Sequence, residues 1–257
     1  MNLKNPRTYN EKIQWLKNHG DIELKSKLTD KFDVREYVAS RVGKKYLVDL
    51  LPLNSNRDLC VSSADCIDWD MLPSQFALKL TKGSGFNIIC NDKSALNKRV
   101  VFDRIKKWLE VNNYYLSREP QYKGQNKIIA EKLLEYNIKD YKFFCFDSEP
   151  KMFKVDINRF NGHHANYYDL DWNLFDLDEG GCPHDPTAKI SKPKEFEEMI
   201  DVARKLAQGW PFVRIDLYVY EGNVYFGEMT FHPSGGYTPL YPDKWQLKFG
   251  NLIKLKE

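Results

Sequence analysis

The stretch FVRIDLYVYEGNVYFGEMT, residues 212–230, is the most informative part of the sequence. Two runs of alternating apolar residues flank Glu221–Gly222, so the stretch predicts an antiparallel hairpin. Alternation puts Arg214 and Asp216 on one face of the first strand, and the turn can bring Glu228 close to them. Charges on such an apolar strand are unfavourable to bury without partners. They are explained equally well by a cross-strand ion pair and by a site for Mg²⁺ and phosphate.

The composition is typical of a folded globular protein, with 42% hydrophobic and 29% charged residues among 257. A formal net charge of +3 is too small to indicate nucleic-acid binding. No apolar stretch is long enough to span a bilayer, and the N-terminus lacks the apolar region of a secretory signal. Five cysteines without a CxxC pair favour a reduced protein, so we expect a cytoplasmic location.

Upstream of the hairpin, the sequence predicts helices first and antiparallel hairpins later, which indicates an α+β fold. Thr8 and Glu11 have the spacing of a capping box, and residues 54–70 are expected to form a polar connection. Residues 161–192 are rich in His, Asn, Asp, Gly and Pro and predict a long irregular loop. The expected strands are 76–80, 87–90, 127–131, 140–146, 151–158, 212–219 and 223–230, and the expected later helices are 95–111 and 196–207.

A glycine-containing turn follows the strand that carries Lys79, in the sequence FALKLTKGSGFN. Gly83, Ser84 and Gly85 are small enough to let backbone N–H groups approach phosphate oxygens, and a lysine adds a positive charge. The segment has neither Walker A nor Rossmann spacing. As an isolated motif it is more typical of an ordinary turn, because turns with this composition are common.

A second candidate segment is IIAEKLLE, residues 128–135. A strand that ends in charged residues and enters a loop can offer backbone donors and acceptors to an adenine ring, here between Glu131 and Leu134. A plain strand edge explains the same pattern.

Taken in this order, the motifs resemble the TupA-like ATP-grasp family, which is named for teichuronopeptide synthesis and is found among bacterial surface-polysaccharide genes. The resemblance implies an ATP-grasp fold of the α+β class. Two small subdomains rich in antiparallel strands, 72–134 and 135–257, would clasp ATP, and 1–71 would be a helical N-terminal segment. The residues that carry the resemblance are 6–17, 31–38, 76–90, 128–135, 140–151, 167–174 and 211–236.

The resemblance also implies roles for individual residues. Position 230 departs from the family, because a threonine stands where the third metal ligand is usually asparagine. Arg159 is expected to contact an acceptor carboxylate or a phosphate, although a solvated loop arginine is equally consistent. The implied contacts are Lys79, Gly83, Ser84, Gly85, Glu131, Lys132, Leu134 and Asp140 for ATP, Lys142 as a second phosphate-binding cation, Arg214 for the transferred phosphate, and Asp216, Glu228 and Thr230 for Mg²⁺.

The function implied by the resemblance is an ATP-dependent carboxylate–amine ligase that forms an amide through an acyl phosphate. Its partners would be a carboxylate-bearing sugar, as a nucleotide sugar or a lipid-linked saccharide, and an amine or amino acid for polysaccharide synthesis. A metal-dependent glycosyltransferase is an alternative, because Asp169–Leu170–Asp171 has the DxD form. A degenerate ATP-binding module is another, supported by Thr230. The irregular spacing of His163, His164, His184 and Cys182 does not favour a zinc site.

Overall fold

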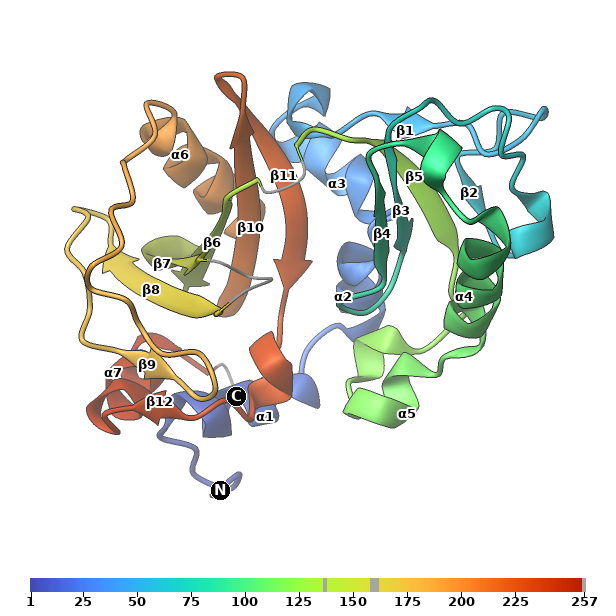
Figure 1. Ribbon diagram of the computed structural model, residues 1–257. Coiled ribbons are helices and arrows are strands. Elements are labelled where there is room, and N and C mark those ends of the chain that lie inside the picture. The colour runs from blue at the N-terminus through green and yellow to red at the C-terminus, as the bar shows by residue number, and fades with distance from the viewer. Residues whose placement is uncertain (136–137, 158–161, 256–257) are drawn as a thin grey trace. The chain divides into compact units, whose positions relative to one another are not determined.

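The computed structural model describes residues 1–135, 138–157 and 162–255 (Figure 1). The chain divides into two compact units. The first unit comprises Met1–Ile22, Val38–Tyr46 and Ile138–Glu257, and the second comprises Glu23–Tyr37 and Leu47–Asn137. Residues of the expected N-terminal segment, 1–71, therefore contribute to both units.

The second unit is built on an antiparallel sheet in the order β1-β5-β3-β4, with β2 also paired to β5. Its core forms between this sheet and helix α4, because Val101 and Ile105 of the helix pack with alternate residues of β3. The elements of this part of the chain are α2 (Ile22–Thr29), α3 (Val34–Arg41), β1 (Leu50–Leu51), β2 (Cys60–Val61), β3 (Phe76–Leu80), β4 (Asn87–Cys90), α4 (Lys98–Glu110), α5 (Asn113–Ser117) and β5 (Ile128–Lys132). The residues of α3 from Val38 onward belong to the first unit.

The first unit is built on an antiparallel sheet in the order β11-β10-β6-β7-β8, shown with its helix α6 in Figure 1. Strands β9 and β12 pair separately. The elements of this unit are α1 (Tyr9–Lys17), β6 (Asp140–Phe146), β7 (Glu149–Ile157), β8 (His164–Asp169), β9 (Asp178–Glu179), α6 (Phe196–Ala207), β10 (Phe212–Tyr220), β11 (Asn223–Thr230), β12 (Leu240–Tyr241) and α7 (Lys244–Leu252).

The two faces of the first unit's large sheet have different partners. Helix α6 packs across β6, β7 and β10 on one face, where Phe143, Phe153 and Phe196 are fully buried with ring centroids 5.0 to 5.8 Å apart. Burying each such side chain stabilises the fold by about 1.5–3 kcal/mol. On the other face, Phe144 and Phe212 join a core cluster that includes residues of α1 and α7. The buried charged residues of β6, β7 and β10 alternate onto this second face.

Short 3₁₀ helices connect several elements, and they add no layer to either sheet. They are η1 (Lys44–Tyr46), η2 (Ala64–Cys66), η3 (Lys93–Ala95), η4 (Pro120–Tyr122) and η5 (Pro233–Gly236). None of the helices in the described parts of the chain is both long and apolar enough to cross a membrane.

Most predicted elements are confirmed, including the capping box, in which Thr8 accepts from the backbone of Glu11. The prediction of one irregular loop over 161–192 is wrong, because its described part contains β8 and β9. Polar His, Asn and Asp residues conceal the alternation of Ala165 and Tyr167, which are buried on one face of β8. The polar connection over 54–70 likewise contains the short strand β2.

Candidate functional site

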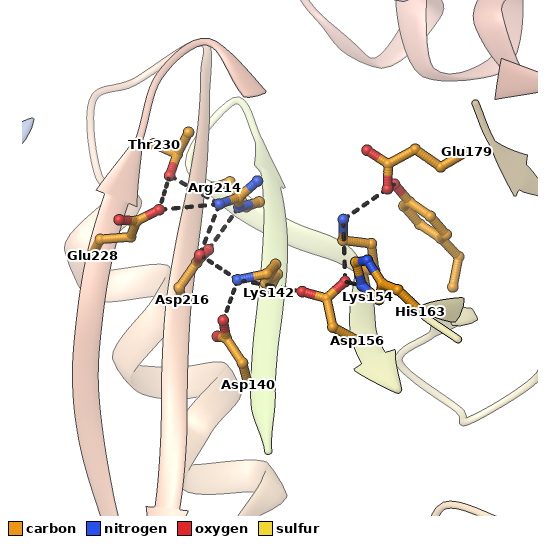
Figure 2. Close-up of polar contacts among 11 residues, drawn as sticks. Asp140, Lys142, Lys154, Asp156, His163, Glu179, Arg214, Asp216, Glu228 and Thr230 are labelled. Carbon is orange, nitrogen blue, oxygen red and sulfur yellow. Dashed lines mark hydrogen bonds and ion pairs between the residues drawn. The ribbon is translucent and has the colours of Figure 1, made fainter. Parts of the chain in front are cut away.

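One row of cross-strand partners in the first unit contains the buried charged residues Lys142, Lys154 and Asp216. Glu228 lies opposite Asp216, Asp216 opposite Lys142, Lys142 opposite Lys154, and Lys154 opposite Tyr167. Side chains that face each other in this way are close enough to interact. The hairpin and the two central strands therefore bring residues from 142 to 228 into one line, which we call the charged row (Figure 2).

Asp216 is the most buried member of the charged row, with 1% of its surface exposed. Its Oδ1 accepts from Arg214 Nε at 2.7 Å, and its Oδ2 accepts from Arg214 Nη2 at 2.7 Å and from Lys142 Nζ at 2.8 Å. Burial alone would raise the pKa of Asp216, but the charges of Arg214 and Lys142 hold it well below its usual range. Asp216 is therefore ionised at neutral pH and holds both cations in place.

Lys142 lies between carboxylates of three strands. It donates to Asp216 and Asp140, and its Nζ is 3.7 Å from Asp156 Oδ2. Burial would lower the pKa of Lys142, but the charges of Asp140 and Asp216 raise it above its usual value. The lysine therefore stays positive although its side chain is only 8% exposed.

The second strand of the hairpin contributes Glu228 and Thr230. Arg214 Nη2 donates to Glu228 Oε1 at 3.2 Å and to Thr230 Oγ1 at 3.1 Å. The Thr230 hydroxyl donates to the same Glu228 oxygen at 3.0 Å. The cross-strand ion pair expected from the sequence is thus present, and it is part of a larger network that includes Asp216.

The chemistry of this network fits a divalent cation. Among the described residues, the carboxylates of Asp140, Asp156, Asp216 and Glu228 lie beside the cations Lys142, Arg214 and Lys154, so the network is rich in carboxylate oxygens. Carboxylate and hydroxyl oxygens are ligands that Mg²⁺ prefers, and it usually completes its shell with water and phosphate oxygens. Asp216 and Glu228, with Thr230 beside them, offer that donor set, and in this structure the Asp216 oxygens accept from Arg214 and Lys142.

The described residues contain no group of three or more His, Cys, Asp or Glu side chains arranged as a ready-made metal cage. A Mg²⁺ ion at the hairpin would therefore depend on phosphate oxygens to complete its coordination, as is usual for nucleotide sites.

In the second unit, Lys79 and Glu131 lie on the neighbouring strands β3 and β5. Lys79 Nζ is 2.5 Å from Glu131 Oε2, and Arg35 Nη1 is 3.7 Å from Glu131 Oε1. Lys79 remains 24% exposed at its side chain. Glu131 therefore orients a lysine that still reaches solvent.

The glycine loop after β3 is held at its base by specific contacts. Lys31 Nζ donates to Gly83 O at 2.9 Å, and the side chain of Asn113 lies where a Cβ on Gly83 would be placed. Gly83 and Gly85 have φ values of 86° and 82°, which glycine adopts without strain. The loop geometry therefore depends on both glycines, and Ser84 between them is exposed.

The expected adenine hinge begins where β5 ends at Lys132. The Lys132 backbone N–H donates to Asp49 O at 2.9 Å, so this donor is already used within the sheet. The side chain of Lys132 is exposed and Leu134 is half-buried.

Two charged residues of β7 were not among the site residues predicted from the sequence. Lys154 and Asp156 share the face of the charged row, and Lys154 pairs with Glu179 of β9 at 2.7 Å. The segment KMFKVDI carries a Lys and an Asp two positions apart on an apolar strand, the same signal as Arg214 and Asp216. Two opposite charges spaced two apart on an apolar strand are therefore a pattern that identifies Lys154 and Asp156 as well. Arg159 lies outside the described residues.

The DxD segment has a local structural role. Asp169 Oδ1 accepts from the backbone N–H groups of Asp171 and Asn173 at 3.0 and 2.8 Å. Such bonds stabilise a turn after a strand. Asp178, in the similar sequence nearby, accepts from His184.

The chain combines an antiparallel α+β fold with a buried charged row that is rich in carboxylate oxygens. A family model described as TupA-like ATPgrasp matches residues 11–254. The chain therefore belongs to the TupA-like ATP-grasp family, and the predicted family and fold class are confirmed.

Solved structures with similar folds include D-alanine–D-alanine ligases. The enzyme from Bacillus anthracis is 15% identical with a TM-score of 0.43, over 80% of this chain and 57% of that chain. The ligase from Helicobacter pylori is 14% identical with a TM-score of 0.43, over 88% of this chain and 61% of that chain.

N5-carboxyaminoimidazole synthetase from Staphylococcus aureus, complexed with ADP, is 14% identical with a TM-score of 0.43, over 80% of this chain and 45% of that chain. The chain thus spans about half to three fifths of the length of these structures. No curated protein matches it.

Proposed function

We propose that the protein is an ATP-dependent carboxylate–amine ligase that forms an amide through an acyl phosphate. Membership of the ATP-grasp family supports ATP as the phosphoryl donor. The observation that carries the proposal is the charged row, in which buried cations and carboxylates meet at one hairpin. This arrangement suits phosphoryl transfer, whose catalysis rests mainly on positioning and on charge stabilisation.

The reaction would proceed in two steps. A substrate carboxylate oxygen attacks the γ-phosphorus of ATP, so that a new P–O bond forms and ADP leaves with the electron pair. An amine nitrogen then attacks the acyl carbon, a C–N bond forms, and phosphate leaves. The proton released from the nitrogen passes to solvent. Arg214 and Lys142 would stabilise the negative charge on the transferred phosphoryl group.

Asp216 and Glu228 would hold Mg²⁺, with Thr230 as a direct or water-mediated ligand. When bound, Mg²⁺ neutralises phosphate charge and orients the polyphosphate. Asp216 has a second task in this scheme, because its bonds to Arg214 and Lys142 fix the positions of both cations.

The remaining nucleotide contacts are proposed for the second unit. Lys79 would bind ATP phosphates, oriented by Glu131, and Gly83, Ser84 and Gly85 would offer backbone N–H groups to them. Glu131, Lys132 and Leu134 would flank the adenine, and Asp140 would bind the ribose.

The substrates are proposed on the strength of the family resemblance. The carboxylate would belong to a uronic-acid sugar, carried as a nucleotide sugar or a lipid-linked saccharide, and the amine would be an amino acid or another amine. This reaction would serve bacterial capsule, O-antigen or cell-wall polysaccharide synthesis in the cytoplasm.

Nucleotide binding gives the first test. We expect the non-hydrolysable analogue AMP-PNP with Mg²⁺ to raise the melting temperature, because a ligand that binds the folded state stabilises it. Glu228→Gln should weaken the binding of Mg–AMP-PNP by about tenfold and the effect of Mg²⁺ should disappear, since a metal ligand is lost. Glu197→Gln, which removes an exposed ion pair with Lys192, is the matched control and should bind like the wild type.

The reaction itself is tested by a screen of carboxylates against amines, read as ADP release. ADP formation that requires both partners would support the ligase. Stabilisation by a uridine diphosphate sugar with Mn²⁺, without any response to Mg–AMP-PNP, would instead indicate the glycosyltransferase. Nucleotide binding with no ADP release from any pair would favour the degenerate ATP-binding module.

A further inference from the structure

Lys82 immediately precedes Gly83 of the glycine loop, and the proposed nucleotide chemistry does not use it. The residue is buried, with 7% of its surface exposed. Lys82 Nζ donates to Lys123 O at 2.7 Å and to the Ser26 hydroxyl oxygen at 3.4 Å. The side chain of Lys82 therefore joins three segments of the second unit that are far apart in the sequence.

The surroundings of Lys82 differ from those of a lysine that binds phosphate. Burying an ammonium group is unfavourable unless acceptors surround it, and here the acceptors are oxygens of the protein itself. Burial lowers the pKa of Lys82, and the charges of Asp30 and Asp33 oppose this shift. Lys79, by contrast, keeps 24% of its side chain exposed. Lys79 thus reaches solvent, whereas Lys82 is held by the protein.

Gly124 makes room for the ammonium group of Lys82. A Cβ on Gly124 would lie 3.2 Å from Lys82 Nζ, and the φ of this glycine is 103°. Residues with a side chain rarely adopt such a φ. The turn at Gly124 therefore presents the Lys123 carbonyl oxygen to Lys82 without crowding the ammonium group.

Two further side chains hold the loop next to Lys82. Lys31 Nζ donates to Gly83 O at 2.9 Å, and Asn113 Nδ2 donates to Lys82 O at 3.4 Å. Asn113 is 7% exposed, and a Cβ on Gly83 would lie 3.0 Å from Asn113 Oδ1. The carbonyl oxygens of Lys82 and Gly83 are thus both bonded to side chains, and the proposed phosphate donors are N–H groups of the same loop.

A cavity adjoins these contacts. Its volume is about 290 Å³, and its lining includes Asn113, Lys123, Gly124 and Asn126. Atoms that line a cavity have fewer van der Waals neighbours to hold them in place. The position of the loop therefore depends on its hydrogen bonds more than on close packing.

We propose that Lys82 is a positioning residue that fixes the glycine loop for the nucleotide phosphates, with its ammonium group bound to Lys123 O instead of to phosphate. The proposal rests on the proposed ATP-dependent function and names a residue that prepares its phosphate site. A loop that is ordered before the ligand arrives loses less freedom on binding, so its affinity for phosphate is higher.

Hydrogen exchange without nucleotide tests the positioning directly. The Leu80 N–H donates to Phe86 O at 3.0 Å. The Thr81 N–H donates to Lys127 O at 2.9 Å, so these two amides report on the base of the loop. We expect Lys82→Met to speed their exchange by about tenfold, because the ammonium group that ties the loop to its neighbours is lost. Amides in the middle of β5 should exchange as in the wild type.

Nucleotide titration tests the consequence for binding. Lys82→Met should bind Mg–AMP-PNP about tenfold more weakly, while its affinity for adenosine, which has no phosphate, should change by less than about twofold. Asn113→Ala removes a second support without changing a charge, and it should shift exchange and Mg–AMP-PNP binding in the same directions. Lys107→Met, at an exposed lysine of α4 in the same unit, is the matched control and should alter neither.

Wild-type exchange rates in Lys82→Met would contradict the proposal, and weaker Mg–AMP-PNP binding with those rates would show that Lys82 binds phosphate directly. Faster exchange with wild-type affinity for Mg–AMP-PNP would also overturn it, because the position of the loop would not matter. Equal losses of adenosine and Mg–AMP-PNP affinity would indicate damage to the whole unit and count against it. A wild type that binds no Mg–AMP-PNP contradicts the ligase, and the exchange of Leu80 and Thr81 still decides whether Lys82 holds the loop.

Discussion

Asp216 combines two demands that are usually met by different residues. It is proposed to bind Mg²⁺, yet both of its oxygens already hold buried cations, Arg214 and Lys142. Since an uncompensated charge in the interior is strongly unfavourable, this carboxylate stabilises the sheet as well as the proposed site. Loss of activity on replacing Asp216 would therefore report on the fold and the chemistry together.

We predict that Asp216→Asn lowers the free energy of unfolding by about 3 kcal/mol, because Arg214 and Lys142 remain buried after the central charge is gone. Urea denaturation followed by circular dichroism measures this. Glu228→Gln is the comparison, since the Glu228 side chain is 31% exposed and should change stability by less than about 1 kcal/mol. Equal stability of Asp216→Asn and the wild type would show that Asp216 does not hold the network together.

At the scale of elements, the hairpin geometry depends on Gly227. The register of β10 and β11 shifts between Asp216 and Leu217, as at a β-bulge, and a glycine in a strand often marks such a site. A Cβ on Gly227 would lie 3.0 Å from the Asp216 carbonyl oxygen and 2.9 Å from the Tyr218 ring. The bulge therefore brings the backbones of β10 and β11 close together, next to the cross-strand pair Asp216 and Glu228.

We predict that Gly227→Ala destabilises the protein by about 1–3 kcal/mol, because backbone atoms cannot give way as a flexible side chain can. It should also weaken Mg–AMP-PNP binding, since Glu228 is the next residue in the strand. Thermal unfolding and nucleotide titration measure the two effects. Gly222→Ala is less suitable as a control, because Gly222 has a φ of 72°. Asn223→Ala, at the exposed end of β11, should change neither.

The strands could be predicted where the sequence shows a clear alternation of side chains with a period of two. β3, β4, β6 and β11 match their expected limits, because each is bounded by turn residues. β8 was missed because Ala165 and Tyr167 alternate with His164 and Asn166, whose polarity is typical of a loop. Asn166 is fully buried and donates to Asp185 O at 2.7 Å, a tertiary contact that local sequence does not reveal.

The site was predictable to the extent that it lies on the hairpin. Arg214, Asp216 and Glu228 came from strand alternation, and the resemblance added Lys142. Lys154 and Glu179 could not be connected to them from the sequence, because the register of β6, β7 and β8 decides which residues face each other.

At the scale of the whole molecule, the charges that respond to acid are unevenly distributed. In the first unit, bonds to the backbone of Arg7, Asn2 and Thr8 lower the pKa of Glu11 to about 2. Backbone and side-chain bonds from His184 lower the pKa of Asp178. Burial would raise the pKa of Asp216, but the charges of Arg214 and Lys142 lower it below its usual value. Glu11 and Asp178 are largely exposed, as are Glu36 and Asp92 of the second unit, whose pKa values are also lowered. Interactions of exposed groups are weak, so the difference between the units rests on the buried Asp216.

These shifts determine how stability changes with pH. A carboxyl whose pKa is lower in the folded state than in the unfolded state stabilises the fold at any pH above its ordinary value, about 4 to 4.5. That stabilisation is lost as the pH falls through the folded pKa, which is about 2 for Glu11. Lys142 has a raised pKa, so its contribution is lost only far above neutral pH. Stability should thus be nearly constant from pH 6 to 8 and decline below pH 4.

We therefore predict that acid unfolds the first unit before the second. Hydrogen exchange, pulse-labelled after incubation at each pH between 6 and 2, should show loss of protection in β6 and β10 at a higher pH than in β3 and β5. Glu36→Gln, an exposed carboxyl of the second unit, should leave both midpoints unchanged. Asp216→Asn should make the stability of the first unit depend less on pH, because the carboxyl that must be protonated is absent. Earlier loss of protection in β3 and β5 would show that buried carboxylates of the charged row do not set the acid limit.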